Sequence, residues 1–285
     1  MSSESISQDV PTDHVLVLGP DQARSKALAT ADIVQAIRER DLWTHFAWND
    51  VLMRYRRSRL GQFWFTLSIA IFVGAIGTFY GAVLDVSIDE YLPFLSIGYV
   101  LWSYLVSITA EGSIVFVSSA TYLSQHRIPL SVFVLRCVQR NMLIFMHNAL
   151  VVVFVLLIFP QGLSWSLLTL IPAFAIWYVC SCWLVMFLGL IAVRFRDVTQ
   201  IVANIMQIAF FLTPVIWQPS LLKGNTRLIA DLNPFAHFLA IIREPLMGNA
   251  PDPVSWVVCI VIATAGAFVT FLTLVRVRSR VPYWL

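Results

Sequence analysis

Long stretches without a charged residue are the feature that most constrains this chain. Asp, Glu, Lys and Arg are all absent from five runs, which cover residues 61–84, 91–110, 141–193, 198–222 and 253–275. A helix needs about 20 apolar residues to cross the hydrocarbon core of a bilayer. Only 12% of the residues are charged, whereas soluble domains carry roughly 25%. The sequence therefore predicts a polytopic membrane protein and excludes a soluble globular enzyme.

The longest run, 141–193, has room for two helices and contains a turn signal at Pro160-Gln161-Gly162. The runs are continuously apolar, whereas the strands of a membrane barrel alternate in polarity. We therefore expect an all-α fold with one transmembrane domain over 61–275. Its six membrane-spanning helices are placed at about 61–84, 91–112, 138–159, 163–193, 198–218 and 253–275.

The distribution of basic residues gives the expected orientation. Six spans put both termini on one side, and all but three of the 19 Lys and Arg residues fall on that side. The three exceptions, Lys223, Arg227 and Arg243, lie in one loop on the other side. The positive-inside rule then predicts a multi-pass protein of the inner (cytoplasmic) membrane with both termini in the cytoplasm. The basic excess is thus a signal of topology, and we expect no nucleic-acid partner.

The segment before the first span has an unusual composition. Residues 1–30 are rich in Ser, Asp and Thr, which is typical of a mobile cytoplasmic tail. Residues 41–60 then mix aromatic residues with Arg54, Arg56, Arg57 and Arg59. Trp suits the headgroup region and Arg suits anionic lipid, so 31–60 is predicted to form an amphipathic helix along the membrane surface. The alternative is that these arginines only enforce orientation.

Two longer segments between spans carry further structure. Residues 118–127 are too polar to span, and Pro129 should interrupt a helix, so we expect a short helix-turn that suits docking of a cytoplasmic partner. In the 219–252 loop, Asn233-Pro234 is typical of a helix start. The helix that follows is too short to span, and we expect it to be re-entrant or interfacial. The final residues, 276–285, are predicted to be a cytoplasmic tail.

Polar and aromatic side chains inside the spans are candidates for a channel lining. Asn204 and Gln207 share one face of the fifth span, and Pro214 is expected to kink that helix. Trp64, Phe72 and Phe79 lie in the first span, where aromatic rings would suit the C–H faces of sugar rings. Hydrogen bonds between helices and ordinary helix packing are the respective alternatives.

Motifs for catalysis are missing from the sequence. There is no glycine-rich phosphate loop ending in Gly-Lys-Ser/Thr, no HExxH, no CxxC and no GxSxG. We expect no enzyme activity, catalytic residue, metal or cofactor on this chain. The His147-Asn148 pair favours a hydrogen bond between helices over a place on a substrate path. Glu111 lies at the cytoplasmic end of the second span, where orientation or a cytoplasmic ion pair explains it as well as ion coupling would. Energy for transport would then come from a partner.

Several motifs, in their order along the chain, resemble permease subunits of ABC-2 type polysaccharide and O-antigen exporters. The opening, 42–65, contains Asp50, then Arg54-Tyr55-Arg56, then Leu60-Gly61 and Trp64. Further matches are Arg194-Phe195-Arg196-Asp197, Phe210 to Val215, Leu232-Asn233-Pro234 and the end Tyr283-Trp284-Leu285. The resemblance covers residues 40–285.

The resemblance implies a homodimer with two copies of a cytoplasmic ABC ATPase, which binds the ATP and Mg. It implies export of an undecaprenyl-diphosphate-linked glycan, such as O-antigen in lipopolysaccharide biosynthesis, between the two permeases. The helix before the first span would be a gate, and the coupling helix that docks on the ATPase would comprise Tyr122, Leu123, Ser124, Gln125, His126, Arg127, Ile128 and Pro129. Many relatives carry Lys and Phe-Pro where this chain has Gln125 and Ile128-Pro129.

The function predicted from the sequence is thus a permease for a lipid-linked polysaccharide, driven by a separate ATPase. Arg54, Tyr55, Arg56, Arg57 and Arg59 are candidates for binding the lipid diphosphate, and the alternative is that these arginines contact only bulk lipid. Two other functions stay open. One is export of another cargo, such as a teichoic-acid-type polymer, capsule, lipid or drug, and the other is a membrane scaffold without transport.

Overall fold

The computed structural model describes residues 22–56, 63–84, 86–126, 128–162, 164–221 and 227–285. Within these ranges the regular elements are all helical. The α-helices are α1 (Gln22–Arg38), α2 (Arg40–Tyr55), α3 (Phe63–Leu84), α4 (Ile88–Ser113), α5 (Ala120–Gln125), α6 (Leu130–Ile158), α7 (Leu170–Arg194), α8 (Val198–Leu212), α9 (Leu228–Asp231), α10 (Pro234–Leu246), α11 (Pro253–Val277) and α12 (Val281–Trp284).

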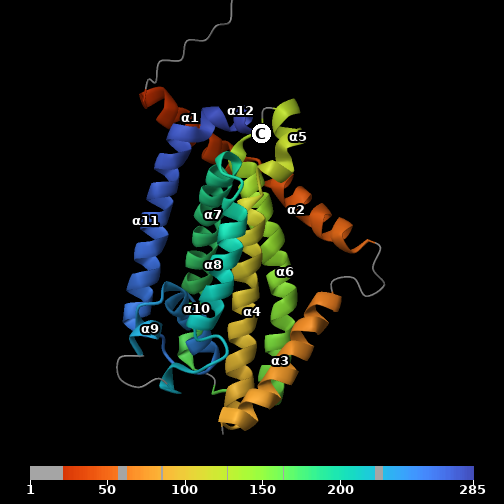
Figure 1. Cartoon of the computed structure of the whole chain (residues 1–285), viewed down its shortest axis with the longest axis vertical. Coiled ribbons are helices and arrows are strands. Elements are labelled where there is room, and N and C mark those ends of the chain that lie inside the picture. The colour runs from red at the N-terminus through yellow and green to blue at the C-terminus, as the bar shows by residue number, and fades with distance from the viewer. Residues whose placement is uncertain (1–21, 57–62, 85, 127, 163, 222–226) are drawn as a thin grey trace, which may run out of the picture.

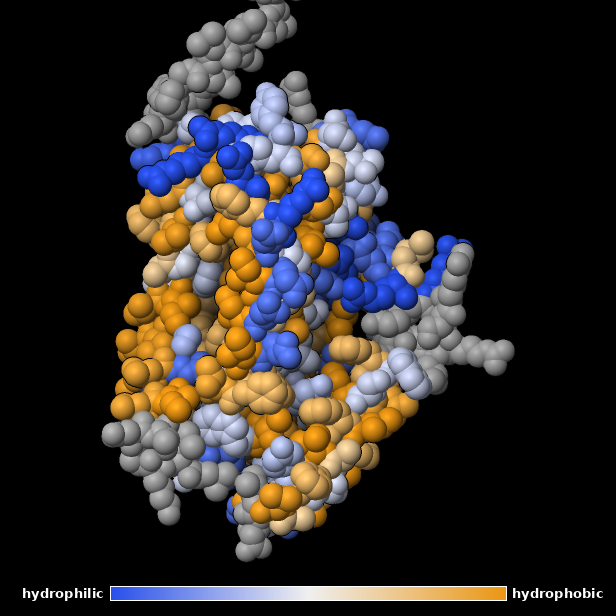
Figure 2. Space-filling view, in the orientation of Figure 1, coloured by the Kyte–Doolittle hydropathy of each residue, from blue (hydrophilic) through white to orange (hydrophobic). Residues whose placement is uncertain are grey.

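The long helices form a bundle around α4, α6 and α7 (Figure 1). Helix α3 packs on α4 and α6, α8 packs on α4 and α7, and α11 packs mainly on α7. Helices α1, α5 and α12 lie at one end of the bundle, which we call the α5 end, and α9 and α10 lie towards the other. The space-filling view shows apolar side chains over the length of the bundle and hydrophilic ones gathered towards the α5 end (Figure 2).

Five helical segments in the described ranges are long and apolar enough to cross a membrane: Phe63–Val83, Ile88–Ser113, Leu130–Ile158, Trp165–Arg194 and Pro253–Trp284. They confirm the predicted all-α polytopic membrane fold. The remaining predicted span, the fifth at 198–218, contains α8, which has 15 residues. At 1.5 Å per residue, α8 is about 22 Å long, shorter than the roughly 30 Å hydrocarbon core of a bilayer. The count of six spans therefore stays a prediction.

The end of α8 differs from the expected helix over 198–218 with a kink at Pro214. The helix stops at Leu212, and Thr213 adopts an extended conformation. A residue before proline is disfavoured in the α region, so the helix ends instead of bending. The chain after α8 is fixed by other helices: the Tyr91 hydroxyl donates to the Ile216 carbonyl at 2.7 Å, and the Asn233 amide donates to the Leu212 carbonyl at 3.1 Å.

The third predicted span, 138–159, begins earlier than the sequence indicated. Helix α6 starts at Leu130, directly after Pro129, which occupies the N-cap position with ψ 139°. The predicted start lay too far along the chain because Arg136 and Arg140 precede the uncharged run from which the span was located. In the structure both arginines pair with carboxylates, as described below, so the helix continues through them.

The expected mobile tail covered residues 1–30, but its last part, 22–30, belongs to helix α1. Residues 1–21 lie outside the described ranges. Helix α1 is anchored by Asp32, whose side chain is fully buried. The Asp32 carboxylate accepts hydrogen bonds from the backbone N–H groups of Leu130 and Ser131, both at 3.0 Å, and lies 2.9 Å from Arg278 Nε. One carboxylate thus joins α1, the start of α6 and the segment after α11.

The region between α8 and α11 contains the predicted short helix. Asn233 is its N-cap and accepts a hydrogen bond from the Phe235 N–H, and Gly248 after its end has φ 82°. Helix α10 packs against α4, α7 and α11. The buried Arg243 guanidinium lies over the Phe94 ring at 4.0 Å, in space that Gly98 of α4 leaves open because it has no Cβ.

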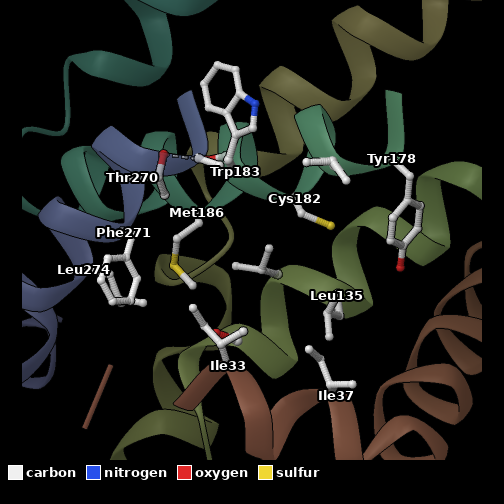
Figure 3. Close-up of a pocket in the computed structure, with 14 residues that line it drawn as sticks. Ile33, Ile37, Leu135, Tyr178, Cys182, Trp183, Met186, Thr270, Phe271 and Leu274 are labelled. Atoms are coloured by element: carbon white, nitrogen blue, oxygen red, sulfur yellow. Dashed lines mark hydrogen bonds between the residues drawn. The ribbon is translucent and has the colours of Figure 1, made fainter. Parts of the chain in front are cut away.

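An apolar cavity of about 350 Å³ lies where α1 meets α6, α7 and α11 (Figure 3). Ile33 and Ile37 from α1 form one wall of it, and Trp183 and Thr270 lie on the far side. The Thr270 hydroxyl donates to the Trp183 carbonyl at 3.3 Å and joins α11 to α7. Helix α1 is therefore packed into the bundle as a wall of this cavity.

Candidate functional site

Charged side chains from α2, α4 and α6 meet near the α5 end. We call them, with Asn141, the charge cluster, and its members are Asp50, Arg54, Glu111, Arg136, Arg140 and Asn141. The Arg136 guanidinium donates two hydrogen bonds to Asp50, from Nε at 2.7 Å and from Nη2 at 2.6 Å. Arg140 Nη1 donates to the same carboxylate at 2.8 Å. A bidentate pair of this kind fixes geometry as well as supplying energy, so α2 is held on α6.

Glu111, in the last turn of α4, is the other acceptor in the charge cluster. Its carboxylate accepts hydrogen bonds at 2.6 Å from Arg54 Nη2, Arg140 Nη2 and Asn141 Nδ2. The Glu111 side chain is 15% exposed and that of Arg140 is 21% exposed. Arg140 therefore bridges the two carboxylates, and Glu111 joins α4 to both α2 and α6. Of the alternatives that the sequence left open for Glu111, the structure shows the ion pair.

The protonation of Asp50 gives the charge cluster a defined response to acid. Burial by itself raises the pKa of the Asp50 carboxyl, but the hydrogen bonds and charges of Arg136 and Arg140 outweigh burial and hold the pKa below its ordinary value of 3.8. Because the folded-state pKa is the lower one, the stabilisation is complete above the ordinary value and is lost as the pH falls through the folded-state pKa.

We therefore expect the melting temperature (Tm) of Asp50→Asn to lie below that of the unmodified protein by a constant amount between about pH 7 and pH 5. Below about pH 4 the two values should converge, since protonation removes the same charge that the substitution removes. Thermal unfolding in detergent across this range measures the difference. A difference that stays constant down to about pH 2 would contradict the assigned ion pairs.

Helix α2 also contacts the short helix α5. The ring centroids of Phe46 on α2 and Tyr122 on α5 lie 6.3 Å apart. The Arg136 guanidinium lies over the same Phe46 ring, 5.4 Å from its centroid. Phe46 thus lies between α5 and an arginine that binds Asp50. Phe46 therefore connects α5 to α2 and to the charge cluster.

A groove of about 560 Å³ lies between α3, α4 and α8, and we call it the α3–α4–α8 groove. Aromatic rings make much of its wall: Phe72 stacks on Tyr99 with ring centroids 4.1 Å apart, and Trp102 lies 5.9 Å from Phe210. Ser103, Ser107, Thr109 and Gln207 supply polar groups. Rings with a few hydroxyl and amide groups suit a ligand with both C–H faces and hydroxyls, as a sugar has.

The charge cluster and the α3–α4–α8 groove are connected by one hydrogen bond. The Ser107 hydroxyl, which lines the groove, donates to Asn141 Oδ1 at 2.6 Å. The amide nitrogen of Asn141 donates to Glu111. Three hydrogen bonds thus connect α2 to the groove wall, from Arg54 to Glu111, from Asn141 to Glu111 and from Ser107 to Asn141.

The structure separates the candidates for a channel lining. Phe72 and Gln207 line the α3–α4–α8 groove, whereas Trp64, Phe79 and Asn204 are not among its lining residues. Trp64 and Phe79 are each about 60% exposed on the outside of α3, and Asn204 accepts a hydrogen bond from Gln200 on α8. Of the three aromatic candidates in the first span, Phe72 therefore lies in the groove, and Trp64 and Phe79 lie on the outer surface.

The candidates for diphosphate binding and for coupling are also divided. Arg54 is occupied by Glu111, Arg56 is exposed in the turn after α2, and Arg57 and Arg59 lie outside the described residues. The backbone of Tyr55 ends α2. The predicted helix-turn is present as α5, which carries exposed Tyr122, Ser124 and Gln125 and the half-buried Leu123. His126 is exposed, Ile128 is half-buried, Pro129 is buried, and Arg127 is outside the described residues.

The His147-Asn148 pair has the predicted structural role. The Thr66 hydroxyl of α3 donates a hydrogen bond to Asn148 Oδ1 at 3.0 Å and lies 3.0 Å from His147 Nδ1. The pair therefore joins α3 to α6. This confirms the hydrogen bond between helices that the sequence favoured.

Sequence reasoning missed Arg136, Arg140 and Asn141 as functional candidates. Arg140 directly precedes the uncharged run 141–193, and Asn141 is the first residue of that run. A basic residue at the edge of such a run is usually interpreted only as a signal of orientation. A usable signal was present, because Glu111 directly follows the uncharged run 91–110 and Asp50 is the last carboxylate before the run 61–84. Opposite charges at matching depths in neighbouring helices are expected to pair.

Comparison with known proteins identifies the family of the chain. The family model described as "ABC-2 type transporter" matches residues 42–247. A relative from Klebsiella pneumoniae, the O-antigen export system permease protein RfbA, is 25% identical over 201 residues, which are 70% of this chain and 78% of the relative. A protein of the same name from Myxococcus xanthus is 23% identical over 235 residues, 76% of this chain and 90% of the relative. The matched region runs from within α2 to the end of α10 and includes both the charge cluster and the groove. The chain belongs to the ABC-2 type transporter family.

Proposed function

We propose that this chain is the permease subunit that exports a lipid-linked polysaccharide, similar to O-antigen, across the cytoplasmic membrane. The observation that supports it most strongly is the aromatic and hydroxyl-lined α3–α4–α8 groove, connected by hydrogen bonds to charged residues at the α5 end. Relatives with the name of O-antigen export permeases support the same cargo class. In this proposal the α5 end and both termini face the cytoplasm, where the basic residues favour that placement.

Two copies of the chain would form the complete channel. Helix α8 beside the groove exposes a row of apolar residues with helical spacing, Ile201, Ile205, Ile208 and Leu212. Residues at positions i, i+4, i+7 and i+11 occupy one face of a helix. Pairing of two chains along this face would bring two grooves together around one path. The proposed assembly is therefore a homodimer.

The energy would come from two copies of a separate cytoplasmic ABC ATPase, which binds the ATP and Mg. Helix α5 is the proposed docking element, and its motion would pass from Tyr122 to Phe46 and then to Arg136. The charge cluster would transmit that motion to α4 through Glu111, and Ser107 would carry it to the groove wall. The lipid diphosphate would meet Arg56 first, because Arg54 is already paired with Glu111.

Blocking the α3–α4–α8 groove tests the proposal. Ser103→Trp places a large ring in the groove, where the native hydroxyl makes only a local bond to the Val100 carbonyl. We expect surface polysaccharide to be lost and lipid-linked polysaccharide to accumulate inside the cell. The matched control is Phe268→Trp on the outer surface of α11, which should export normally.

Two results would contradict the proposal. Normal surface polysaccharide in Ser103→Trp, at unchanged protein level, would exclude the groove as the path. Deletion of the whole gene without any change in surface polysaccharide would exclude this cargo and favour another, such as a teichoic-acid-type polymer, a lipid or a drug. Purification of the tagged chain without an ATPase subunit would favour a scaffold instead.

A further inference from the structure

The last eight residues of the chain, 278–285, are packed against the α5 end of the bundle. Val281 is fully buried, and the Arg194 guanidinium lies over the Trp284 ring at 5.1 Å. In contrast, Tyr283 is 88% exposed. Helix α12 contacts both α7 and α5, and Figure 1 shows it beside α5 at the end of the bundle. The C-terminal segment is therefore fixed in place while it presents an aromatic ring outward.

A hollow of about 310 Å³ lies between this segment and α5. Two stretches of chain far apart in sequence form it: Ala120, Thr121, Leu123 and Ser124 from α5, with Pro282 and Leu285 from the C-terminal segment. It has both apolar and polar groups in its wall. A hollow of this kind at the tip of the molecule can receive one side chain of a partner protein.

Basic residues surround this end of the molecule without matching carboxylates. Arg194 ends α7 and Arg196 lies in the turn that follows it, and Arg276 and Arg280 flank the end of α11. All four are exposed, and the described residues give them no carboxylate within ion-pair distance, whereas Arg278 pairs with Asp32. Arg194 has a ring partner instead, Trp284. This charge is complementary to an acidic surface.

We propose that the C-terminal segment (278–285) and the turn at 194–197 form, together with α5, a single docking surface for an acidic face of the ATPase subunit. A side chain of the ATPase would enter the hollow between α5 and Leu285, with Tyr283 beside it and the four arginines around it. Tyr and Arg are the residue types most enriched at the energetic centres of protein interfaces. The inference rests on the proposed function, because it assigns the partner by its role.

A protein partner fits this surface better than a lipid headgroup. Arginines that only contact lipid phosphate need no ordered hollow and no outward aromatic ring beside them. Here the same short segment supplies Leu285 to the hollow and Trp284 to the cation–π contact with Arg194. The segment thus ties the basic turn to α5, which is the element proposed to receive the ATPase.

The test measures how much ATPase subunit is recovered with the purified, tagged chain. Leu285→Glu puts a negative charge at the hollow, and Tyr283→Ala removes the exposed ring; we expect each to lower recovery about tenfold, as for a central interface residue. Arg280→Glu should lower recovery more at low salt than at high salt, since exposed charges are screened. The matched control is Phe268→Ala, another exposed aromatic residue, on α11. An unchanged Tm and gel-filtration profile of each variant excludes misfolding.

A double variant separates this inference from the proposed function. Gln125→Glu combined with His126→Glu changes two exposed positions at the end of α5 that do not line the hollow. Loss of ATPase from this variant, with full recovery in Leu285→Glu and Tyr283→Ala, would overturn the inference and leave α5 docking intact. Full recovery in all three would overturn α5 docking as well. A loss of bound anionic phospholipid in Arg280→Glu, with ATPase recovery unchanged, would assign the arginines to lipid and also overturn the inference.

Discussion

Replacement of Glu111 by Gln should abolish most export activity and lower the stability of the protein. The substitution leaves Arg140 and Arg54 without the carboxylate that both bind at 2.6 Å. Removing one partner of a buried pair costs about 3–5 kcal/mol, because an uncompensated charge stays behind. Partial exposure of the charge cluster and the 46% exposure of Arg54 reduce this to roughly 1–3 kcal/mol. The loss of export should be larger than the loss of stability alone explains, since Glu111 also joins α2 to α4.

The measurement is surface polysaccharide at matched protein level, with Tm in detergent as the reading of stability. The matched control is Asp41→Asn on α2, because Asp41 is 91% exposed and lies 3.8 Å from Arg40; both readings should stay unchanged. In the double variant Glu111→Gln with Arg140→Gln, Tm should partly recover because the buried charge is gone, while export should stay low. Normal export in Glu111→Gln would exclude the charge cluster as part of the coupling route.

Replacement of Asp32 by Ala should release α1 from the bundle. The fully buried carboxylate accepts hydrogen bonds from two backbone N–H groups at the start of α6 and from the Ser131 hydroxyl at 2.7 Å, and it pairs with Arg278. We expect the free energy of unfolding to fall by about 3 kcal/mol or more, because the variant leaves buried hydrogen-bond donors unsatisfied and the Arg278 cation unpaired. Asn at the same position should cost less, since its amide oxygen still accepts hydrogen bonds.

Hydrogen exchange measured along the chain gives the most direct reading of this effect. Amides of α1 and of the first turn of α6 should exchange faster in Asp32→Ala, while those in the middle of α4 should not change. Thr30→Ala is the control on the same helix, because that hydroxyl makes only a local, exposed bond to the Lys26 carbonyl. Unchanged protection of α1 in Asp32→Ala would show that the apolar contacts of Ile33 and Ala29 hold the helix without this carboxylate.

Much of the fold could be predicted because membrane spans are locally encoded. In lipid, each helix must satisfy its own backbone hydrogen bonds, so composition over about 20 residues is enough to find it. This explains the agreement for α3, α4 and α11 with the predicted 61–84, 91–112 and 253–275. Two boundaries were misplaced. The start of α6 depended on carboxylates elsewhere in the chain that pair with Arg136 and Arg140, whereas α8 ends before Pro214 because a residue before proline is disfavoured in the α region.

The candidate site was predicted less completely, for the same physical reason. Asp50 and Arg140 are separated by 90 positions, and Glu111 and Arg54 by 57, so no local pattern connects them. The sequence did place Phe72 and Gln207 on plausible faces, because helical periodicity fixes which residues share a face. It could not distinguish Phe72 in the groove from Trp64 and Phe79 on the outer surface, because that depends on how α3 packs against α4.

The sequence by itself therefore determined the membrane class, the helical fold, the side with most of the positive charge and the absence of recognisable catalytic motifs. These follow from composition, run length and the cost of charge in hydrocarbon, which act within single helices. The tertiary structure alone decided that Asp32 folds α1 onto α6, that Asp50 and Glu111 neutralise arginines at the edge of α6, and that a groove opens between α3, α4 and α8. Those features arise when distant helices bring charges and rings into contact, and contact between helices is what a run of apolar residues does not specify.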